Sequence, residues 1–493
     1  MEPPSTPTEL EGRLHPLALL VIARRFVGAS LLPLFALLVS LGTKVLVPLL
    51  LAALLLGVPL AVLSWSRFRY RVGEGRLELR SGVLSRNVRT IPLDRIRGVD
   101  VSAPFLHRLL GLVKVEVEAA AGGGSQAELS LAAVSRAQAD ALRTVLLRAE
   151  PAAVGATDPT LLHSAKPALL ALGGITSMRY LLAPLAIVGV LFNLADDFPG
   201  GFVERAGEVA VDHVPTDPLG VVTGAAGVFV LVLAIGAAGS LLVDWGFKLV
   251  DEGERLTASR GLLTRRVVTI DRERIRGADV RDTPLRRPFG LVSVTAIVAG
   301  LRGRTGGTTL APVVRAREAH RLLRSVDQAA PDPAAPLLRH PLPARGRRLV
   351  RALALPLPAV LVAIALRVPW AVAGTFAVAI LALVLALDRY RQLGHRFDGR
   401  RLVLRDGSLR RRWSEVDPAG VVAFELRSSP GQRRAGLCTL VVHLGQGTGS
   451  RQALDLGEEQ AAGLLAGLHP TLLEPLLNRP DQLERASSSM SAE

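Results

Sequence analysis

The chain has 493 residues and a net charge of +16, with 59 lysines and arginines against 43 aspartates and glutamates. Its length exceeds that of one ordinary domain, and its single cysteine excludes both an intramolecular disulfide and a cysteine-based metal cluster. Charged residues make up 21% of the chain although its mean hydropathy is positive, so long apolar runs must alternate with charged blocks. This pattern is typical of a membrane protein with several spans, and the basic surplus fits the flanks of such spans without a nucleic-acid partner.

One stretch of the chain occurs twice. Residues 82–113 return 179 positions later as residues 261–292, and Arg95-Ile96-Arg97-Gly98 aligns with Arg274-Ile275-Arg276-Gly277. A fainter third copy lies 325 positions beyond the first, where Gly420-Val421-Val422 replaces the double-arginine motif. Repetition at this spacing predicts three related units of about 160 residues each.

The first elements along the chain are apolar runs of about the length that crosses a bilayer. They predict membrane spans in pairs, at residues 26–42 and 45–64, 178–194 and 219–243, and 352–366 and 370–387. These spans contain almost no ionisable residues, which disfavours an ion-coupled transporter. The first residues are acidic and the first apolar run begins late, so no cleavable signal peptide is expected.

After each pair of spans, the hydrophobic period becomes that of a strand. Residues 76–80 and 113–118 alternate between polar and apolar, and further strands are predicted at 88–91, 96–101 and 128–131. The glycines at 122–124 predict a hairpin loop, and Ser135 predicts the N-cap of a closing helix. Short antiparallel strands followed by one helix predict a small open barrel or sandwich.

The paired spans also predict the topology. Each helical hairpin has an even number of spans, so every strand-rich domain falls on the same side of the membrane. Basic residues flank these domains, whereas the loop between the third and fourth spans is acidic. The positive-inside rule therefore predicts a multi-pass cell-membrane protein with both termini and all three domains in the cytoplasm.

The pattern SGVLSRNVRTIPLDRIRGVDV…LLGLVKVEV, preceded by a two-span hairpin, resembles the bacterial pleckstrin-homology (PH) membrane proteins of the YdbS/YdbT-like kind. Three such units in one chain resemble the larger, YdbT-like type. The resemblance implies membrane α-helical hairpins plus three cytoplasmic PH-like β domains, with antiparallel sheets capped by a C-terminal helix. It also implies a smaller YdbS-like membrane protein with one PH-like domain as a partner. It supplies no catalytic residues.

The resemblance gives each predicted segment an identity. The segments are residues 1–64 (N-terminal segment and first hairpin), 65–150 (first PH-like domain), 151–244 (linker and second hairpin with its acidic external loop), 245–330 (second PH-like domain), 331–388 (linker and third hairpin), 389–478 (degenerate third PH-like domain) and 479–493 (a tail predicted to be disordered).

The sequence lacks the motifs of common enzyme and metal sites. It has no phosphate-binding GxxxxGK[ST] and no HExxH, and its nine histidines lack ligand spacing, so no cofactor, metal or catalytic residue is expected. His15, His163 and His340 recur just before each hairpin, and we expect them to be anchors or helix-start elements. The glycines of residues 300–307 favour a turn over a nucleotide loop.

The best candidate site is formed by Arg95 and Arg97, repeated as Arg274 and Arg276. On a strand, both arginines of a pair would project from one face while the isoleucine between them points into the core. Two interpretations stay open: a solvated strand face, or an anion-binding face for lipid headgroups or a partner's carboxylates. The third unit lacks both arginines, so we expect it to lack this surface.

These features favour a polytopic membrane scaffold or adaptor whose three PH-like domains bind a partner protein, in particular another PH-domain membrane protein. The alternative is an anionic-lipid-binding, lipid-handling or export protein that contributes to envelope homeostasis or resistance. Membrane lipids are expected partners in either case, and self-association stays open.

Overall fold

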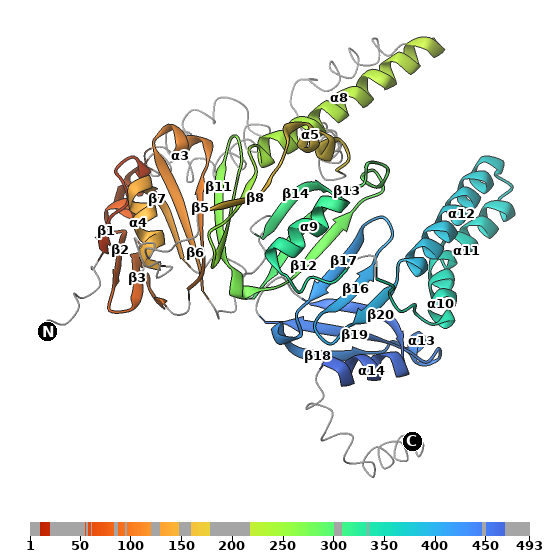
Figure 1. Ribbon diagram of the computed structural model, residues 1–493. Coiled ribbons are helices and arrows are strands. Elements are labelled where there is room, and N and C mark those ends of the chain that lie inside the picture. Colours follow the sequence, from red (N-terminus) through yellow and green to blue (C-terminus); the bar gives the residue numbers. More distant parts are fainter. Residues whose placement is uncertain are drawn as a thin grey trace. The chain divides into compact units, whose positions relative to one another are not determined.

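The structure is a computed structural model, and it describes residues 10–19, 55, 58–60, 62–82, 87–93, 96–119, 129–146, 159–177, 217–299, 308–332, 335–445 and 450–468 (Figure 1). The chain divides into two compact units. The first comprises residues 1–272 with 304–313, and the second comprises residues 273–303 with 314–493.

The first unit begins with a complete strand-rich domain, hereafter the first domain. Its front strands form an antiparallel sheet in the order β1 (Leu10–Gly12), β2 (Arg69–Gly73), β3 (Arg76–Ser81) and β4 (Asn87–Pro92). Its back strands are β5 (Ile96–Ala103), β6 (Leu112–Ala119) and β7 (Leu129–Ser135), with a short helix α3 (Phe105–Leu109) after β5 and the closing helix α4 (Arg136–Leu146) after β7. The strands predicted at 76–80, 88–91, 96–101 and 113–118 are therefore confirmed.

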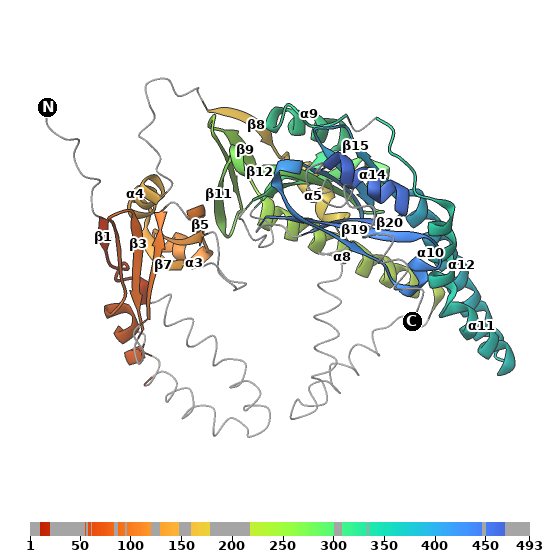
Figure 2. The ribbon, with the colours of Figure 1, turned by 90° about the horizontal axis from the view of Figure 1, so that it is seen from below.

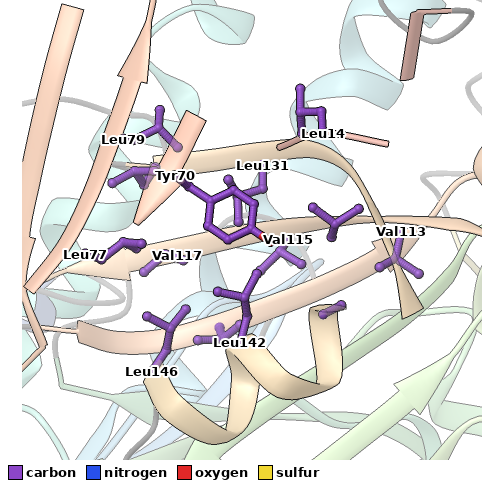
Figure 3. Packing of buried hydrophobic residues seen from close by; sticks show 14 of the residues in the cluster. Leu14, Tyr70, Leu77, Leu79, Val113, Val115, Val117, Leu131, Leu142 and Leu146 are labelled. Atoms are coloured by element: carbon purple, nitrogen blue, oxygen red, sulfur yellow. The ribbon is translucent and has the colours of Figure 1, made fainter. Parts of the chain in front are cut away.

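The core of the first domain lies between its strands and α4 (Figure 3). Alternation along β2 and β3 turns Tyr70, Leu77 and their neighbours inward, and Leu142 and Leu146 of α4 cover them from one side. The start of α4 is fixed by Ser135, as predicted. The Gln138 backbone N–H donates to Ser135 Oγ over 3.2 Å, and the Ser135 N–H donates to Gln138 Oε1 over 3.1 Å.

The same unit continues with the second repeat. Its elements are β8 (Thr160–Ser164), α5 (Pro167–Ile175), α8 (Pro218–Asp244), β9 (Lys248–Asp251), β10 (Arg255–Arg260) and β11 (Arg265–Asp271). Strands β8 to β11 are the front strands of the second domain. They do not form a sheet of their own, because β11 pairs with β5 of the first domain. The result is a seven-stranded sheet in the order β7-β6-β5-β11-β10-β9-β8.

The second unit repeats this arrangement one domain later. It contains β12 (Ile275–Asp282) and β13 (Leu291–Val298), the turns η3 (Arg272–Arg274, at the unit boundary) and η4 (Arg287–Phe289), and α9 (Ala316–Val326); β14 (Thr309–Arg315) extends across the unit boundary. The third domain has front strands β15 (Gly394–Phe397), β16 (Leu402–Asp406) and β17 (Arg411–Val416). Strand β12 pairs with β17, so these strands follow each other in the order β13-β12-β17-β16-β15.

The back strands of the third domain form a separate sheet. They are β18 (Val421–Arg427), β19 (Leu437–Leu444) and β20 (Arg451–Gly457), joined by η5 (Pro418–Gly420) and α13 (Pro430–Arg433) and closed by α14 (Glu458–Leu468), the predicted final helix. Leu440, Leu456 and Leu464 belong to its core.

Three helices in the described residues are long and apolar enough to cross a membrane. They are α8, the helical segment Leu342–Ala365 made of α10 (Leu342–Leu353) and α11 (Pro356–Ala365), and α12 (Pro369–Arg391). They correspond to the predicted fourth, fifth and sixth spans, and α11 and α12 lie side by side (Figure 2). The predicted first and third spans lie outside the described residues, as does most of the second.

Candidate protein-interaction site

The domains of this chain are joined by two strand pairings, which we call seams. Seam 1 pairs β5 with β11, from Asp100 opposite Val268 to Ala103 opposite Arg265. Seam 2 pairs β12 with β17 and places Asp279 opposite Ser414. The repeat moves Asp100 to Asp279 by 179 positions and Val268 to Ser414 by 146, the difference between 325 and 179. Both seams therefore have the same register.

Each seam buries an aspartate and supplies it with arginine. Asp100 is 7% exposed and accepts a hydrogen bond from Arg266 Nε over 2.8 Å. Asp279 is 1% exposed and accepts from Arg451 Nε and Nη2 over 2.9 and 2.7 Å and from Ser414 Oγ over 2.6 Å. Such charge-assisted bonds offset part of the desolvation cost of the buried carboxylates.

The two carboxylates differ in their electrostatic balance. Burial raises the pKa of Asp100, and Arg266 offsets this effect only in part. Burial acts in the same direction on Asp279, but Arg451, Ser414 and Arg281 together outweigh it and lower its pKa. The difference arises because Asp279 has two guanidinium partners, the second being Arg281 Nη2 at 2.6 Å.

The glycine of the repeated Arg-Ile-Arg-Gly motif has a backbone role at seam 2. Gly277 has a φ of +136°, and a Cβ atom placed on it would lie 2.0 Å from the Glu415 carbonyl oxygen on β17. A side chain would therefore separate the two strands. The motif also coincides with a shift of register in each domain, between Ile96 and Gly98, Ile275 and Ala278, and Val421 and Ala423.

The structure places the four candidate arginines in different environments. Arg95 lies outside the described residues, and Arg97 lies in β5 with its side chain outside them. The prediction that Arg274 lies on a strand is wrong, because the chain makes the turn η3 before β12 begins at Ile275. Arg276 does lie on β12, with a partly exposed side chain.

Arg276 faces a carboxylate within its own chain. Its Nη1 lies 3.6 Å from Asp417 Oδ2 of the third domain, and its carbonyl accepts the Asp417 N–H over 2.8 Å. A Cβ atom on Gly420 would lie 2.7 Å from Arg276 Cγ, so the glycine at this position leaves room for the arginine. In the third domain, Gly420 thus replaces the motif's first arginine, and the side chain of Arg276 from the second domain occupies the space beside it.

Helices cover both seams from one side. At seam 1, Arg143 of α4 donates to Thr269 Oγ1 on β11 over 2.7 Å and to Thr257 Oγ1 on β10 over 3.3 Å. At seam 2, His320 of α9 packs edge-on against Trp413 of β17 with ring centroids 6.4 Å apart, and Asp327 at the end of α9 pairs with Arg401. The closing helix of one domain therefore covers the front strands of the next.

Two strands end their sheets where the repeat would place a seam. Strand β4 is the counterpart of β11 and β17, and β18 is the counterpart of β5 and β12. Among the described strands, β4 pairs with β3 and β18 with β19. Both present apolar side chains: Val88 is 51%, Leu426 53% and Val422 73% exposed.

Two of the three repeated histidines, His15 and His340, make structural hydrogen bonds. His15 Nδ1 accepts the Leu17 N–H over 3.3 Å, as expected for a helix-start element. His340 is buried, and its Nδ1 lies 2.8 Å from the Leu454 carbonyl oxygen. Burial and the neighbouring His340 lower the pKa of His395 to about 4. The described residues contain no group of three side chains suited to hold a metal ion.

Comparisons with known proteins agree with this architecture. The family model described as "Bacterial PH domain" matches residues 24–150, 190–330 and 351–469, more than half of the chain. The chain is 24% identical over 305 residues to the UPF0699 transmembrane protein YdbT of Bacillus subtilis (strain 168), a match that covers 54% of this chain and 58% of that protein. The chain thus spans a little over half the length of this relative. No solved structure matches the chain. This membrane protein, with three repeats joined through shared sheets, belongs to the bacterial PH domain family.

Proposed function

We propose that this protein is a multi-pass membrane scaffold whose three cytoplasmic PH-like domains bind a partner protein, and that it works by binding and not by catalysis. The observation that carries the proposal is the repetition of one strand pairing, in one register, at both seams. A surface that already joins PH-like domains within the chain is suited to join a PH-like domain of another protein. The smaller YdbS-like membrane protein implied by the sequence resemblance is the partner of choice.

The arginine motif supports protein contact over headgroup binding. Arg276 faces Asp417, the carboxylate of a neighbouring PH-like domain. Arg97 and Asp271 occupy the equivalent positions at seam 1, 179 and 146 residues earlier. We propose that Arg95, Arg97, Arg274 and Arg276 recognise carboxylates of PH-like domains, within the chain or in a partner.

The test is purification of the tagged full-length protein from its native membrane, with identification of the proteins that co-purify. Changing Arg95, Arg97, Arg274 and Arg276 to Glu is expected to leave membrane insertion intact and to release a specific co-purifying protein. The matched control carries the same change of charge at Arg315, Arg317, Arg321 and Arg324, which are exposed on or beside α9. If no protein co-purifies with the wild-type chain, or if the control releases it equally, the scaffold proposal fails.

A second role, contact with membrane lipids, is favoured by the β10–β11 turn. Leu262 and Leu263 at its tip are 40% and 46% exposed, and the Leu262 N–H donates to the Leu242 carbonyl oxygen of α8 over 3.0 Å. The tip thus lies against the C-terminal end of a membrane helix, where exposed leucines and nearby Arg265 suit the lipid interface.

A further inference from the structure

The front face of the first domain is exposed where its counterparts are covered. Thr90 of β4 is exposed, whereas its counterpart Thr269 of β11 is 3% exposed beneath Arg143 of α4. The same face of β2 and β3 carries exposed arginines at Arg69, Arg71, Arg76 and Arg80, with one carboxylate among them, Glu78, which pairs with Arg80. By the pattern of seams 1 and 2, a back strand and a closing helix from a preceding PH-like domain would cover this face.

The third domain offers the complementary surface. Strand β18 is the back strand that pairs with β19 alone among the described strands, and α14 is the closing helix of its domain. Within Glu458–Leu468, α14 carries Glu458 and Glu459 and no basic residue, whereas α4 carries Arg136 and Arg143 against the single acidic residue Asp140. The closing helix of the third domain is therefore acidic, and the face beside β4 is rich in arginine.

The register of the two seams, applied to β18 and β4, brings opposite charges together. Glu425 occupies the place of Asp100 and Asp279, and Arg89 occupies the place of Val268 and Ser414. The two would lie directly opposite each other. Hydrogen bonds from Arg427, then from His443, lower the pKa of Glu425, whose side chain is 41% exposed, so this carboxylate is charged at neutral pH.

The same register places the exposed apolar residues together. Leu426 and Val88 take the positions of Val101 and Val267, which lie opposite each other in seam 1. Leu426 is 53% and Val88 51% exposed in this chain. Directly opposite side chains on antiparallel strands are close enough to bury one another and to form charge pairs.

We propose that β18 of one copy of this protein pairs with β4 of a second copy, in the register of seams 1 and 2, with α14 covering the arginine-rich front face. The proposal rests on the seam being a mode of recognition, as the proposed function does, and it names a second copy as the occupant. The contact is heterologous and head-to-tail, so it closes into a ring or extends as a row of copies. A contact between copies with the geometry of the seams keeps the hairpins of both copies in one membrane. The reason is that consecutive repeats of one chain are predicted to lie in the same membrane.

The first experiment is a disulfide crosslink between two differently tagged full-length chains in one membrane, both carrying Cys438→Ser. One chain carries Val88→Cys and the other carries Leu426→Cys. Opposite positions in an antiparallel pair have the Cα separation that a disulfide requires. A covalent heterodimer is expected from the mixture and none from either chain alone. The control pairs Leu426→Cys with Leu109→Cys, which is 73% exposed outside the proposed contact.

The second experiment exchanges the charges. Glu425→Arg alone and Arg89→Glu alone are each expected to reduce the chain to a monomer in nanodiscs, measured by mass photometry. A mixture of the two variants restores one contact per pair, so heterodimers are expected to return. Arg89 is exposed and the Glu425 side chain is 41% exposed, and an unchanged melting temperature will show that each variant folds.

The outcomes separate this inference from the proposed function. A wild-type chain that is monomeric in nanodiscs and forms no chain-to-chain disulfide overturns self-association. If that chain still retains a co-purifying protein, the scaffold proposal stands with another occupant at the edges. A heterodimer that forms equally in the control pair, or variants that do not rescue each other, overturns the proposed register.

Discussion

Asp100 and Asp279 interrupt strands whose neighbouring residues are apolar, and each is buried against an arginine from a distant part of the chain. Arg451 lies 172 positions from Asp279 and Arg266 lies 166 positions from Asp100. The sequence contains a signal for the two aspartates, because both copies of the motif place an aspartate two residues after the glycine. Their partners could not be predicted, since no local pattern links a carboxylate to an arginine so far away.

At the residue scale, we expect Asp279→Ala to destabilise the protein by about 3–5 kcal/mol, because it leaves Arg451 buried without its carboxylate. Thermal unfolding in detergent will measure the loss. Asp279→Ala combined with Arg451→Met is expected to cost less than the sum of the single changes. Glu74→Ala, which removes an exposed partner of Arg76, serves as the control and is expected to leave the melting temperature unchanged. An equal loss of stability in Asp279→Ala and Glu74→Ala would contradict the importance of the buried pair.

Glu415 makes stability depend on pH. It lies at seam 2 opposite Ala278, and burial, then the nearby Asp327, raises its pKa from 4.5 to about 8, although Arg401 opposes the shift. The folded state therefore holds a proton that the unfolded state releases above about pH 4.5. This contribution to stability is complete below that pH and is lost as the pH rises to about 8.

We therefore expect the melting temperature of the wild-type protein to fall more steeply between pH 5 and pH 8 than that of Glu415→Gln. The difference corresponds to on the order of a few kcal/mol at pH 8. Glu74→Gln, at a carboxylate whose side chain is 71% exposed, provides the control and should not flatten the profile. Parallel pH profiles for the wild-type protein and Glu415→Gln would show that Glu415 is already charged at neutral pH.

At the scale of the element, alternation predicted the strands well because it depends on which side chains are buried. Residues 76–80 alternate as predicted, and Leu77 and Leu79 are buried. Alternation does not say which strand lies alongside, so neither β5–β11 nor β12–β17 could be predicted. The prediction for Arg274 failed for a related reason. A turn precedes β12 and a register shift lies within it, and period-two patterns do not detect either.

The β10–β11 turn gives a prediction about lipid contact. We expect a tryptophan introduced as Leu262→Trp to be quenched by brominated lipids in nanodiscs, because the turn lies against the end of α8. Since the chain has four native tryptophans, the signal is the additional quenching over the wild-type protein. Val422→Trp, at a position on β18 that is 73% exposed, tests whether any exposed position gives the same result. Equal additional quenching at both positions would mean that contact is not specific to the turn.

At the scale of the whole molecule, each hairpin is predicted to return the chain to the same side of the membrane. Reporters inserted near residues 123 and 306 are expected to give a cytoplasmic signal, and one near residue 209 an exterior signal. A reporter in the Ser-rich segment 487–491 provides a further cytoplasmic reference. An exterior signal near residue 123 or 306 would overturn the parallel arrangement of the repeats.

The shared sheets also have a consequence for synthesis. Strand β5 ends at residue 103 and its neighbour β11 begins at residue 265, so 162 positions (265 − 103) must be translated before seam 1 can form. At usual translation rates this takes about 10–30 s, during which β5 is an exposed edge on a nascent chain. A charged side chain on an edge strand discourages pairing with the wrong neighbour. We therefore expect Asp100 to protect the growing chain from aggregation until Arg266 has been translated and can form its ion pair with Asp100.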